Sequence, residues 1–464
     1  MSDVARREPD GTSDRKSAVR RDLTKGSIPH NLLSLSWPIT VSEGLRVIGP
    51  TIDMIWVGKL GVASVAGVGV AGSIAIGMMV GLKGLNTGMR AMVARFVGAG
   101  DAEEANNIAQ QALVISFTYA FIIAIIGIFF SEQMLSMFGL EADVVTEGAA
   151  YMRIVLLGMV TLSFYQVAES IMQASGDAVT PMRISIIFRV LHLIFCPFLI
   201  FGWWIFPRLG VSGAAVSNVA SQALGMVLGL LVLFAGQTRL RLTMKNFRLD
   251  LNIIWRIIRI GIPAASAMMG RMFGRLGLML FMAPFGTLAV AGHILVERIE
   301  VLITIPGFGF GLASGALVGQ NLGAQQPGRA EKSVWIAVGL AQGIMAICTL
   351  AVLLWPGSII RVFSADPDLV KLTSVFLMIA AAGFLTLGFE AVLGFSLAGA
   401  GDTIPPMLIT MFGFGVQLSL AFILPQVANL EVYGVRWAIV IGMVAGMVVY
   451  ISYFRLGRWK RKKV

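Results

Sequence analysis

Long apolar runs alternate with short polar connectors from residue 30 to residue 455. Each run is long enough to cross a bilayer as a helix, which takes about 20 residues. The runs fall at 30–56, 63–88, 108–130, 149–173, 184–206, 210–235, 258–284, 288–316, 334–356, 372–398, 405–427 and 433–455. Their apolarity is continuous and shows no period of two, which favours helices over the strands of a barrel. We predict an all-α membrane protein with twelve transmembrane helices.

The second six runs repeat the first six. A constant shift of 225 residues aligns matching positions along the chain: Pro38 with Pro263, Arg46 with Arg271, and Gly176-Asp177 with Gly401-Asp402. Six is an even number, so both halves insert in the same direction and the repeats are parallel. We therefore expect an N-lobe at 30–235 and a C-lobe at 258–455 around a central cleft, with rocking of the lobes giving alternating access.

The composition agrees with a chain surrounded by lipid. Hydrophobic residues make up 57% of the 464 and charged residues 13%, whereas soluble domains have about 25% charged residues. The mean hydropathy is +0.83. Both cysteines, Cys196 and Cys348, lie inside apolar runs, so the sequence indicates no disulfide framework.

The net charge of +11 comes from basic residues that gather in three places: a tail at 1–29, a connector at 236–257 and a tail at 456–464. The loop after the third run is instead acidic. The positive-inside rule then puts both tails and the connector in the cytoplasm of a multi-pass plasma-membrane protein, so the charge does not indicate a nucleic-acid partner. No cleavable signal peptide is visible, and we expect the first tail to be disordered.

The first run carries three charges, and each would cost about 2.5–3.5 kcal/mol at the bilayer centre. Glu43 lies one turn before Arg46 and can form a static pair with it, which is as plausible as a role in the substrate cavity. Asp53 has no partner on its own helix, which favours a role in binding a coupling cation. Pro50 should bend the helix between Arg46 and Asp53 and act as a hinge.

Other polar residues of the first half also lie at membrane depth. Glu169 can pair with Arg189 or Arg153, or face a substrate cavity. His192 is more typical of a satisfied core residue than of a proton carrier. Asn218 is expected to hydrogen-bond to another helix. His192 and Asn218 are also candidate residues of the substrate cavity.

The second half holds a larger set of charges: Arg271 and Arg275 in the seventh run, Glu297 and Glu300 in the eighth, and Glu390 in the tenth. Mutual neutralisation between adjacent helices is one interpretation. Cation coupling by Glu297 or Glu300, with Arg271 and Glu390 in the substrate cavity, is the other. Pro306 is a second candidate hinge.

No enzyme or metal motif is present: there is no phosphate-binding GxxxxGK[ST], no HExxH and no His/Cys cluster. The pair His192 and Cys196 has no orienting carboxylate one turn away on its helix. We therefore predict neither an enzyme nor a cofactor, and an intramembrane enzyme is the least favoured hypothesis.

Several motifs together resemble the multidrug and toxic compound extrusion family over residues 30–455: Asp53-Met-Ile-Trp-Val-Gly-Lys-Leu-Gly, Val97-Gly-Ala-Gly-Asp, Arg208-Leu-Gly-Val-Ser-Gly, Pro306-Gly-Phe-Gly and Val318-Gly-Gln-Asn-Leu-Gly-Ala. The resemblance implies a twelve-helix antiporter that exports amphipathic, often cationic compounds in exchange for sodium ions or protons. Its partners would be a small organic substrate, the coupling cation and the lipid bilayer, and the chain would act as a monomer. A flippase for a lipid-linked precursor is the alternative, since a related superfamily shares the architecture.

The resemblance also implies that Asp53 is the first-lobe coupling carboxylate. Many prokaryotic relatives have Asp-Pro in helix 5 with Asn one turn earlier, where this chain has Cys196-Pro197 and His192. An acid of helix 7 in other relatives falls at Arg271. The usual cation cage is thus altered in both lobes, and the coupling ion stays open.

Arg46 and Arg271 occupy equivalent places in the repeats and should face each other across the central cleft. Neutralisation by Glu43, and by Glu297 or Glu300, is one explanation of their presence. If they are free instead, their guanidinium groups suit a carboxylate or phosphate, and the substrate would be zwitterionic or anionic.

Overall fold

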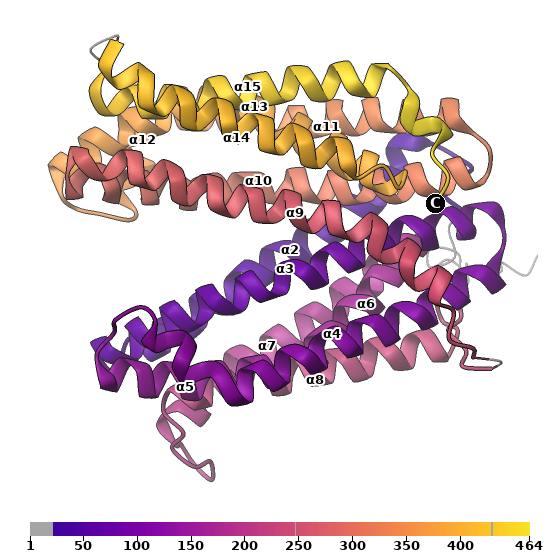
Figure 1. Ribbon diagram of the computed structural model, residues 1–464, viewed down its shortest axis with the longest axis horizontal. Coiled ribbons are helices and arrows are strands. Elements are labelled where there is room, and N and C mark those ends of the chain that lie inside the picture. The colour runs from indigo at the N-terminus through magenta and orange to yellow at the C-terminus, as the bar shows by residue number, and fades with distance from the viewer. Residues whose placement is uncertain (1–21, 246, 428–429) are drawn as a thin grey trace, which may run out of the picture.

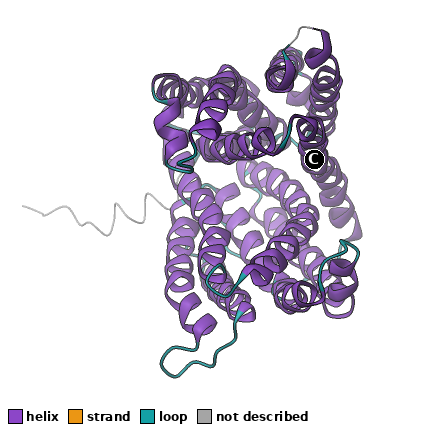
Figure 2. Cartoon of the chain, turned by 90° about the vertical axis from the view of Figure 1, so that its left-hand side faces the viewer, coloured by secondary structure: helices purple, strands orange, loops and turns teal. Residues whose placement is uncertain are grey.

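The computed structural model describes residues 22–245, 247–427 and 430–464, and within these ranges the secondary structure is entirely helical (Figure 2). The first lobe contains α2 (Ile28–Val57), α3 (Val62–Ala99), α4 (Ala102–Ser136), α5 (Ala142–Leu157), α6 (Met159–Ser175), α7 (Val179–Phe201) and α8 (Val211–Phe234). The second contains α9 (Leu251–Met282), α10 (Thr287–Gly323), α11 (Pro327–Leu354), α12 (Pro356–Arg361), α13 (Pro367–Gly399), α14 (Ile404–Val427) and α15 (Glu431–Arg455). Two short 3-10 helices, η1 (Ala283–Phe285) and η2 (Arg458–Arg461), follow α9 and α15.

Each of the twelve predicted runs is helical, which confirms the predicted fold class. Among the described residues, ten helices are long and apolar enough to span a bilayer, and α5 with α6 forms an eleventh, bent by 42°. The remaining run is α2, which has 30 residues but carries Glu43, Arg46 and Asp53. The bend between α5 and α6 lies at Gly158, where a Cβ would overlap the side chain of Val219 in α8.

The two lobes meet at one end of the molecule and diverge toward the other (Figure 1). They meet through glycines, which allow the helix backbones to approach closely. A Cβ on Gly261 of α9 would lie 2.8 Å from the carbonyl oxygen of Gly84 in α3, and one on Gly309 of α10 would lie 2.8 Å from that of Ser36 in α2. A Cβ on Gly98 of α3 would overlap the carbonyl oxygen of Gln320 in α10.

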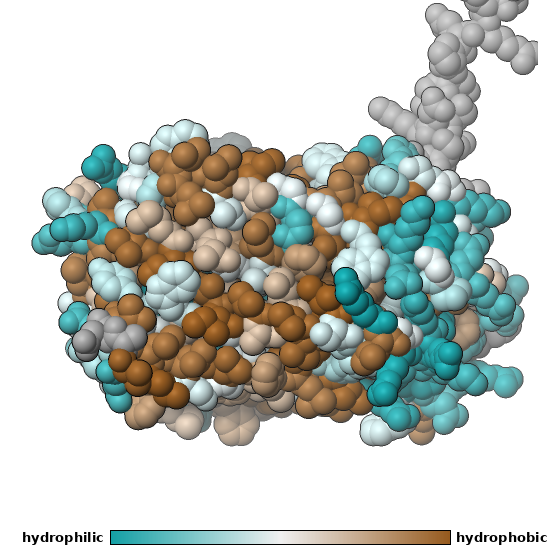
Figure 3. All heavy atoms as spheres, turned by 90° about the horizontal axis from the view of Figure 1, so that it is seen from above, coloured by the Kyte–Doolittle hydropathy of each residue, from teal (hydrophilic) through white to brown (hydrophobic). Residues whose placement is uncertain are grey.

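The first described residues, from Asp22, lie with the connector and the C-terminus at the end where the lobes meet. Asp22 pairs with Arg239 of the connector at 3.4 Å, and Arg95 donates a hydrogen bond to the carbonyl oxygen of Lys462 at 3.0 Å. Hydrophilic side chains gather most densely at the end that carries the C-terminus, whereas apolar ones cover the middle of the same face (Figure 3). This placement agrees with the predicted topology, in which all three basic segments share one side of the membrane.

The ends of both predicted tails are packed against the lobes. Leu23 and Trp459 are both fully buried, and Trp459 stacks on Phe454 with 4.8 Å between ring centroids. The prediction of a disordered tail is therefore wrong for residues 22–29, because Leu23 packs among the helices and α2 already begins at Ile28. Residues 1–21 lie outside the described part of the chain.

We predict that Gly98→Ala destabilises the protein although alanine is the better helix former. The added methyl group overlaps the Gln320 carbonyl across the lobe contact, and such overpacking costs about 1–3 kcal/mol. Thermal unfolding of the purified protein should show a lower midpoint. Gly72→Ala, also in α3, is the matched control. A Cβ added at Gly72 would have no neighbouring atom within 4 Å apart from the adjacent backbone of α3. Equal midpoints for the two variants would show that the close contact is absent.

Candidate functional site

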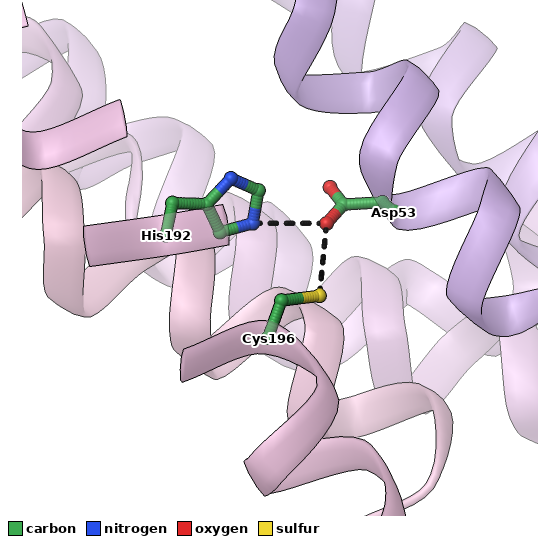
Figure 4. Close-up of side chains that lie close together, drawn as sticks. All are labelled: Asp53, His192 and Cys196. Carbon is green, nitrogen blue, oxygen red and sulfur yellow. Dashed lines mark hydrogen bonds and ion pairs between the residues drawn. The ribbon is translucent and has the colours of Figure 1, made fainter. Parts of the chain in front are cut away.

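Asp53 meets two side chains of α7 in the interior of the N-lobe (Figure 4). His192 and Cys196 lie one turn apart on α7, which packs against α2, so both point toward Asp53. His192 Nε2 lies 2.9 Å from Asp53 Oδ1, and the Cys196 thiol donates to the same oxygen at 3.6 Å. Asp53 is 1% exposed and the other two are fully buried, so the three groups form a closed polar cluster.

Arg189 determines the tautomer of His192 from the other side of the imidazole ring. Its Nη1 donates to His192 Nδ1 at 3.1 Å. A guanidinium group has no acceptor, so Nδ1 must accept and the ring hydrogen sits on Nε2, facing Asp53. The Nε2–Oδ1 contact is within ion-pair distance but does not have the geometry of a hydrogen bond. Asp53 Oδ2 is buried and has no hydrogen-bond partner among the described residues.

Sequence reasoning missed this cluster because its members come from two helices. His192 and Cys196 have no carboxylate on their own helix, but the packing of α2 on α7 supplies Asp53. The three residues offer ligand atoms that all lie within 4.8 Å of one another, so they could also hold a metal ion. Such a mixed set of oxygen, nitrogen and sulfur suits a transition metal better than a hard cation. The absence of a cofactor stays a prediction.

A second cluster of charged side chains connects α2 to α6. Arg46 lies 3.3 Å from Glu43 and 2.7 Å from Glu169, so two carboxylates neutralise it. The pairing of Glu43 with Arg46 agrees with the static-pair interpretation. The expected pairing of Glu169 with Arg189 or Arg153 is wrong, because Arg46 reaches Glu169 across the helix contact and Arg153 pairs with Glu132 at 2.7 Å.

Asn218 forms its hydrogen bond within α8. Its side-chain oxygen accepts from Gln222 one turn later, at 2.7 Å. The predicted hydrogen bond to another helix is therefore not seen among the described residues. The structure brings neither of these amides into the cluster around Asp53.

The C-lobe contains a cleft of about 740 Å³, counting the part open to its surroundings, between α9, α10, α13, α14 and α15. Five charged residues singled out from the sequence line it together: Arg271, Arg275, Glu297, Glu300 and Glu390. Two further lining residues, His293 and Arg436, were not anticipated. Each lies in a predominantly apolar stretch of the sequence. The one signal that could have identified Arg436 is a charged residue inside a predicted membrane span.

Arg436 forms an ion pair with Glu300 in one wall of the cleft. Its side chain is 1% exposed, with Nη2 2.9 Å from Glu300 and Nη1 donating to His293 Nδ1 at 3.0 Å. His293 Nε2 then faces Glu297 at 3.8 Å. An arginine, a histidine and a carboxylate thus follow one another here, as they do at Asp53. The expected neutralisation of Glu300 by Arg271 or Arg275 is wrong, because α15 supplies the cation.

Arg271 and Glu390 have no ion pair within 4 Å among the described residues. The hydrogen bond of Arg271 to Thr410 is long, at 3.4 Å, although Glu390 lies close enough to influence it electrostatically. Lys83 of α3 lies within electrostatic range of both Arg46 and Arg271, so the two arginines border the same region between the lobes. The neutralisation hypothesis thus holds for Arg46 and fails for Arg271.

The two candidate hinges lie inside unbroken helices. α2 continues through Pro50 and α10 continues through Pro306. Each proline removes one backbone hydrogen bond, which makes local bending easier. Their hinge role stays a prediction.

The comparisons with known proteins give one family and one fold. Two proteins named as probable multidrug resistance proteins align over nearly their whole length: YoeA of Bacillus subtilis, 22% identical over 96% of this chain and 97% of its own, and NorM of Thermotoga maritima, 25% identical over 97% and 98%. A MOP superfamily transporter from Pyrococcus furiosus, described as having a binding pocket of reverse polarity, has a TM-score of 0.88 at 23% identity over 95% of this chain and 98% of its own. The Vibrio cholerae MATE transporter VcmN, in its bent form, has a TM-score of 0.87 at 19% identity, covering 95% and 99%.

The MatE family model matches this chain twice, at residues 38–198 and 263–423. Both limits of the second match are shifted by 225 residues from the first, which is the spacing of the internal repeat. Together the matches span more than half of the chain. The protein therefore belongs to the MatE family of multidrug and toxic compound extrusion transporters and not to a family of enzymes.

Proposed function

We propose that the protein is a secondary active antiporter that exports small amphipathic organic compounds in exchange for protons. Family membership supports transport, and the names of the relatives support multidrug export. Within the described part of the chain the lobes meet at one end and diverge toward the other (Figure 1), an arrangement that suits alternating access. The observation that carries the choice of ion is the polar cluster at Asp53.

The chemistry of the cluster favours a proton over sodium. Hard cations prefer several oxygen ligands, but here an imidazole and a thiol surround a single carboxylate. The second oxygen, Oδ2, is buried and free of partners among the described residues, so it can accept a proton without displacing a ligand. Protonation removes a buried negative charge and with it a desolvation cost.

Helix α2 connects this cluster to the contact between the lobes. It carries Asp53 in its second half, and in its first half it packs against α10 of the C-lobe at Thr40 and Gly309. Neutral Asp53 holds the His192–Arg189 pair less strongly than the carboxylate does, which loosens α2 from α7. Proton binding can thereby change how well the lobes fit together, and a substrate that prefers the other arrangement is released.

The positive-inside rule supports an assignment of the conformational state. The described residues from Asp22 onward, the connector and the C-terminal segment lie where the lobes are closed, and basic segments face the cytoplasm. The lobes are then closed toward the cytoplasm and apart toward the outside, which is the state that follows release of an exported compound.

We predict that Asp53→Asn abolishes proton-driven export and still binds the compound, but about fivefold or more weakly than the protein with ionised Asp53, because the neutral amide resembles protonated Asp53. Proteoliposomes with an imposed pH gradient and a fluorescent amphipathic cation provide the measurement. Asp143→Asn at the start of α5 is the matched control, since Asp143 is exposed and should tolerate the change.

Two outcomes of this experiment contradict the proposal. Export by the Asn variant against a gradient would move the coupling site away from Asp53. Export by the native protein under a sodium gradient, without any pH gradient, would make sodium the coupling ion. A flippase for a lipid-linked precursor would export no cation in any of these conditions.

We also predict that both termini and the connector face the cytoplasm. Single cysteines at the exposed positions Glu141 and Lys245, introduced after replacement of Cys196 and Cys348 by serine, report the two sides. An impermeant thiol reagent should label position 141 in intact cells and position 245 only after permeabilisation. Labelling of both positions from the same side would contradict the topology.

A further inference from the structure

The cleft in the C-lobe carries balanced but largely unpaired charge. Three positive and three negative side chains line it: Arg271, Arg275, Arg436, Glu297, Glu300 and Glu390. Only Arg436 and Glu300 form a carboxylate–guanidinium pair within 4 Å, at 2.9 Å. Two arginines and two glutamates are left without such a partner among the described residues. Unpaired charges at bilayer depth are costly and mark sites of ligand or ion passage.

The two free arginines lie one turn apart on one face of α9. Arg271 has only the long contact to Thr410, and no hydrogen bond or ion pair of Arg275 occurs within the described residues. Arg275 does lie close enough to Glu297 to influence it electrostatically. Two guanidinium groups at this spacing present a set of donors that matches a carboxylate.

The free glutamates come from other walls of the same cleft. Glu390 projects from α13 toward Gly446 of α15, where a Cβ would lie 3.0 Å from Glu390 Oε1. Glu297 projects from α10, with His293 Nε2 at 3.8 Å from its carboxylate. These carboxylates can accept a cationic group from the same ligand whose carboxylate the arginines hold.

We propose that the C-lobe cleft binds zwitterionic organic compounds, with Arg271 and Arg275 holding the carboxylate and Glu390 and Glu297 facing the cationic group. This inference rests on the proposed export function and names its substrate class. A simple cation would leave both arginines unpaired, and a simple anion would leave both glutamates unpaired. A dipolar compound satisfies both sets, and apolar residues such as Leu387, Phe414 and Met443 line the remaining wall.

The difference between the two lobes supports this assignment. Arg46, which the repeat makes equivalent to Arg271, is already held by Glu43 and Glu169. Of these two equivalent arginines, Arg271 is therefore the one left to bind a ligand.

Rhodamine B and its ethyl ester test the proposal directly. Rhodamine B is a zwitterion at neutral pH, and the ester keeps the dye cation but lacks the carboxylate. Arg271→Gln should weaken binding and export of rhodamine B at least about tenfold, as expected for loss of a charge-assisted hydrogen bond, and change those of the ester less than about twofold. Arg298→Gln is the matched control, because Arg298 is exposed on α10 and does not line the cleft.

Glu390→Gln tests the carboxylate that is proposed to face the cationic group of the dye. It should weaken both dyes to a similar degree, because both carry the cation. Equal losses of the two dyes in Arg271→Gln, or no loss of either, would overturn the proposal. If that variant does not fold, as judged by gel filtration of the purified protein, Arg271→Lys replaces it. Lysine keeps the positive charge but lacks the planar guanidinium group that can hold a carboxylate with two hydrogen bonds. Arg271→Lys should therefore weaken binding and export of rhodamine B alone, and equal effects on both dyes would again count against the proposal.

Failure of the proposed function gives a different result. Asp53→Asn should stop gradient-driven export of both dyes and leave the ratio of their affinities unchanged. If the native protein binds rhodamine B through Arg271 but exports neither dye, the cleft is a zwitterion site and the antiport proposal is wrong. If it exports both dyes without dependence on Arg271, the antiport proposal stands and the cleft assignment is wrong.

Discussion

The free energy of a charge inside the bilayer is the constraint on which this structure depends. Each ionised side chain at membrane depth needs an opposite charge, a hydrogen-bond donor or a ligand. Arg46 finds two carboxylates, and Arg436 finds Glu300 and the ring of His293. Asp53 finds His192 and Cys196 but keeps one bare oxygen. The groups left incompletely satisfied are the ones to which a transported proton or compound can bind.

The two lobes arose as copies but satisfy this constraint differently. In the N-lobe, Arg46 is neutralised and the incomplete group is a buried carboxylate, which suits a proton. In the C-lobe, Arg436 pairs with Glu300, whereas Arg271 and Glu390 line a cleft without an ion pair within 4 Å among the described residues. This arrangement suits a larger dipolar molecule. Coupling then requires the lobes to influence each other, and their contact through α2 and α10 provides the physical connection.

The sequence was sufficient to predict the twelve helices and the repeat, because long apolar runs and a constant 225-residue shift are properties of the chain itself. Contacts within one helix, such as Glu43 with Arg46, were also within reach, since helical spacing determines them. Contacts between helices were not. His192 with Asp53 and Arg436 with Glu300 depend on the rotation and depth of helices that are far apart in sequence. The apolar pattern of a lipid-embedded helix constrains neither quantity closely, because apolar residues face both lipid and protein.

Competition between the proton and the exported compound at equilibrium tests the central claim most directly. Addition of a substrate dye to the purified protein in weakly buffered detergent solution should release protons, because binding favours the form with ionised Asp53. The account predicts proton release by the native protein at a pH where Asp53 is protonated, and none by Asp53→Asn. No release from the native protein at any pH, or equal release from both proteins, would contradict it.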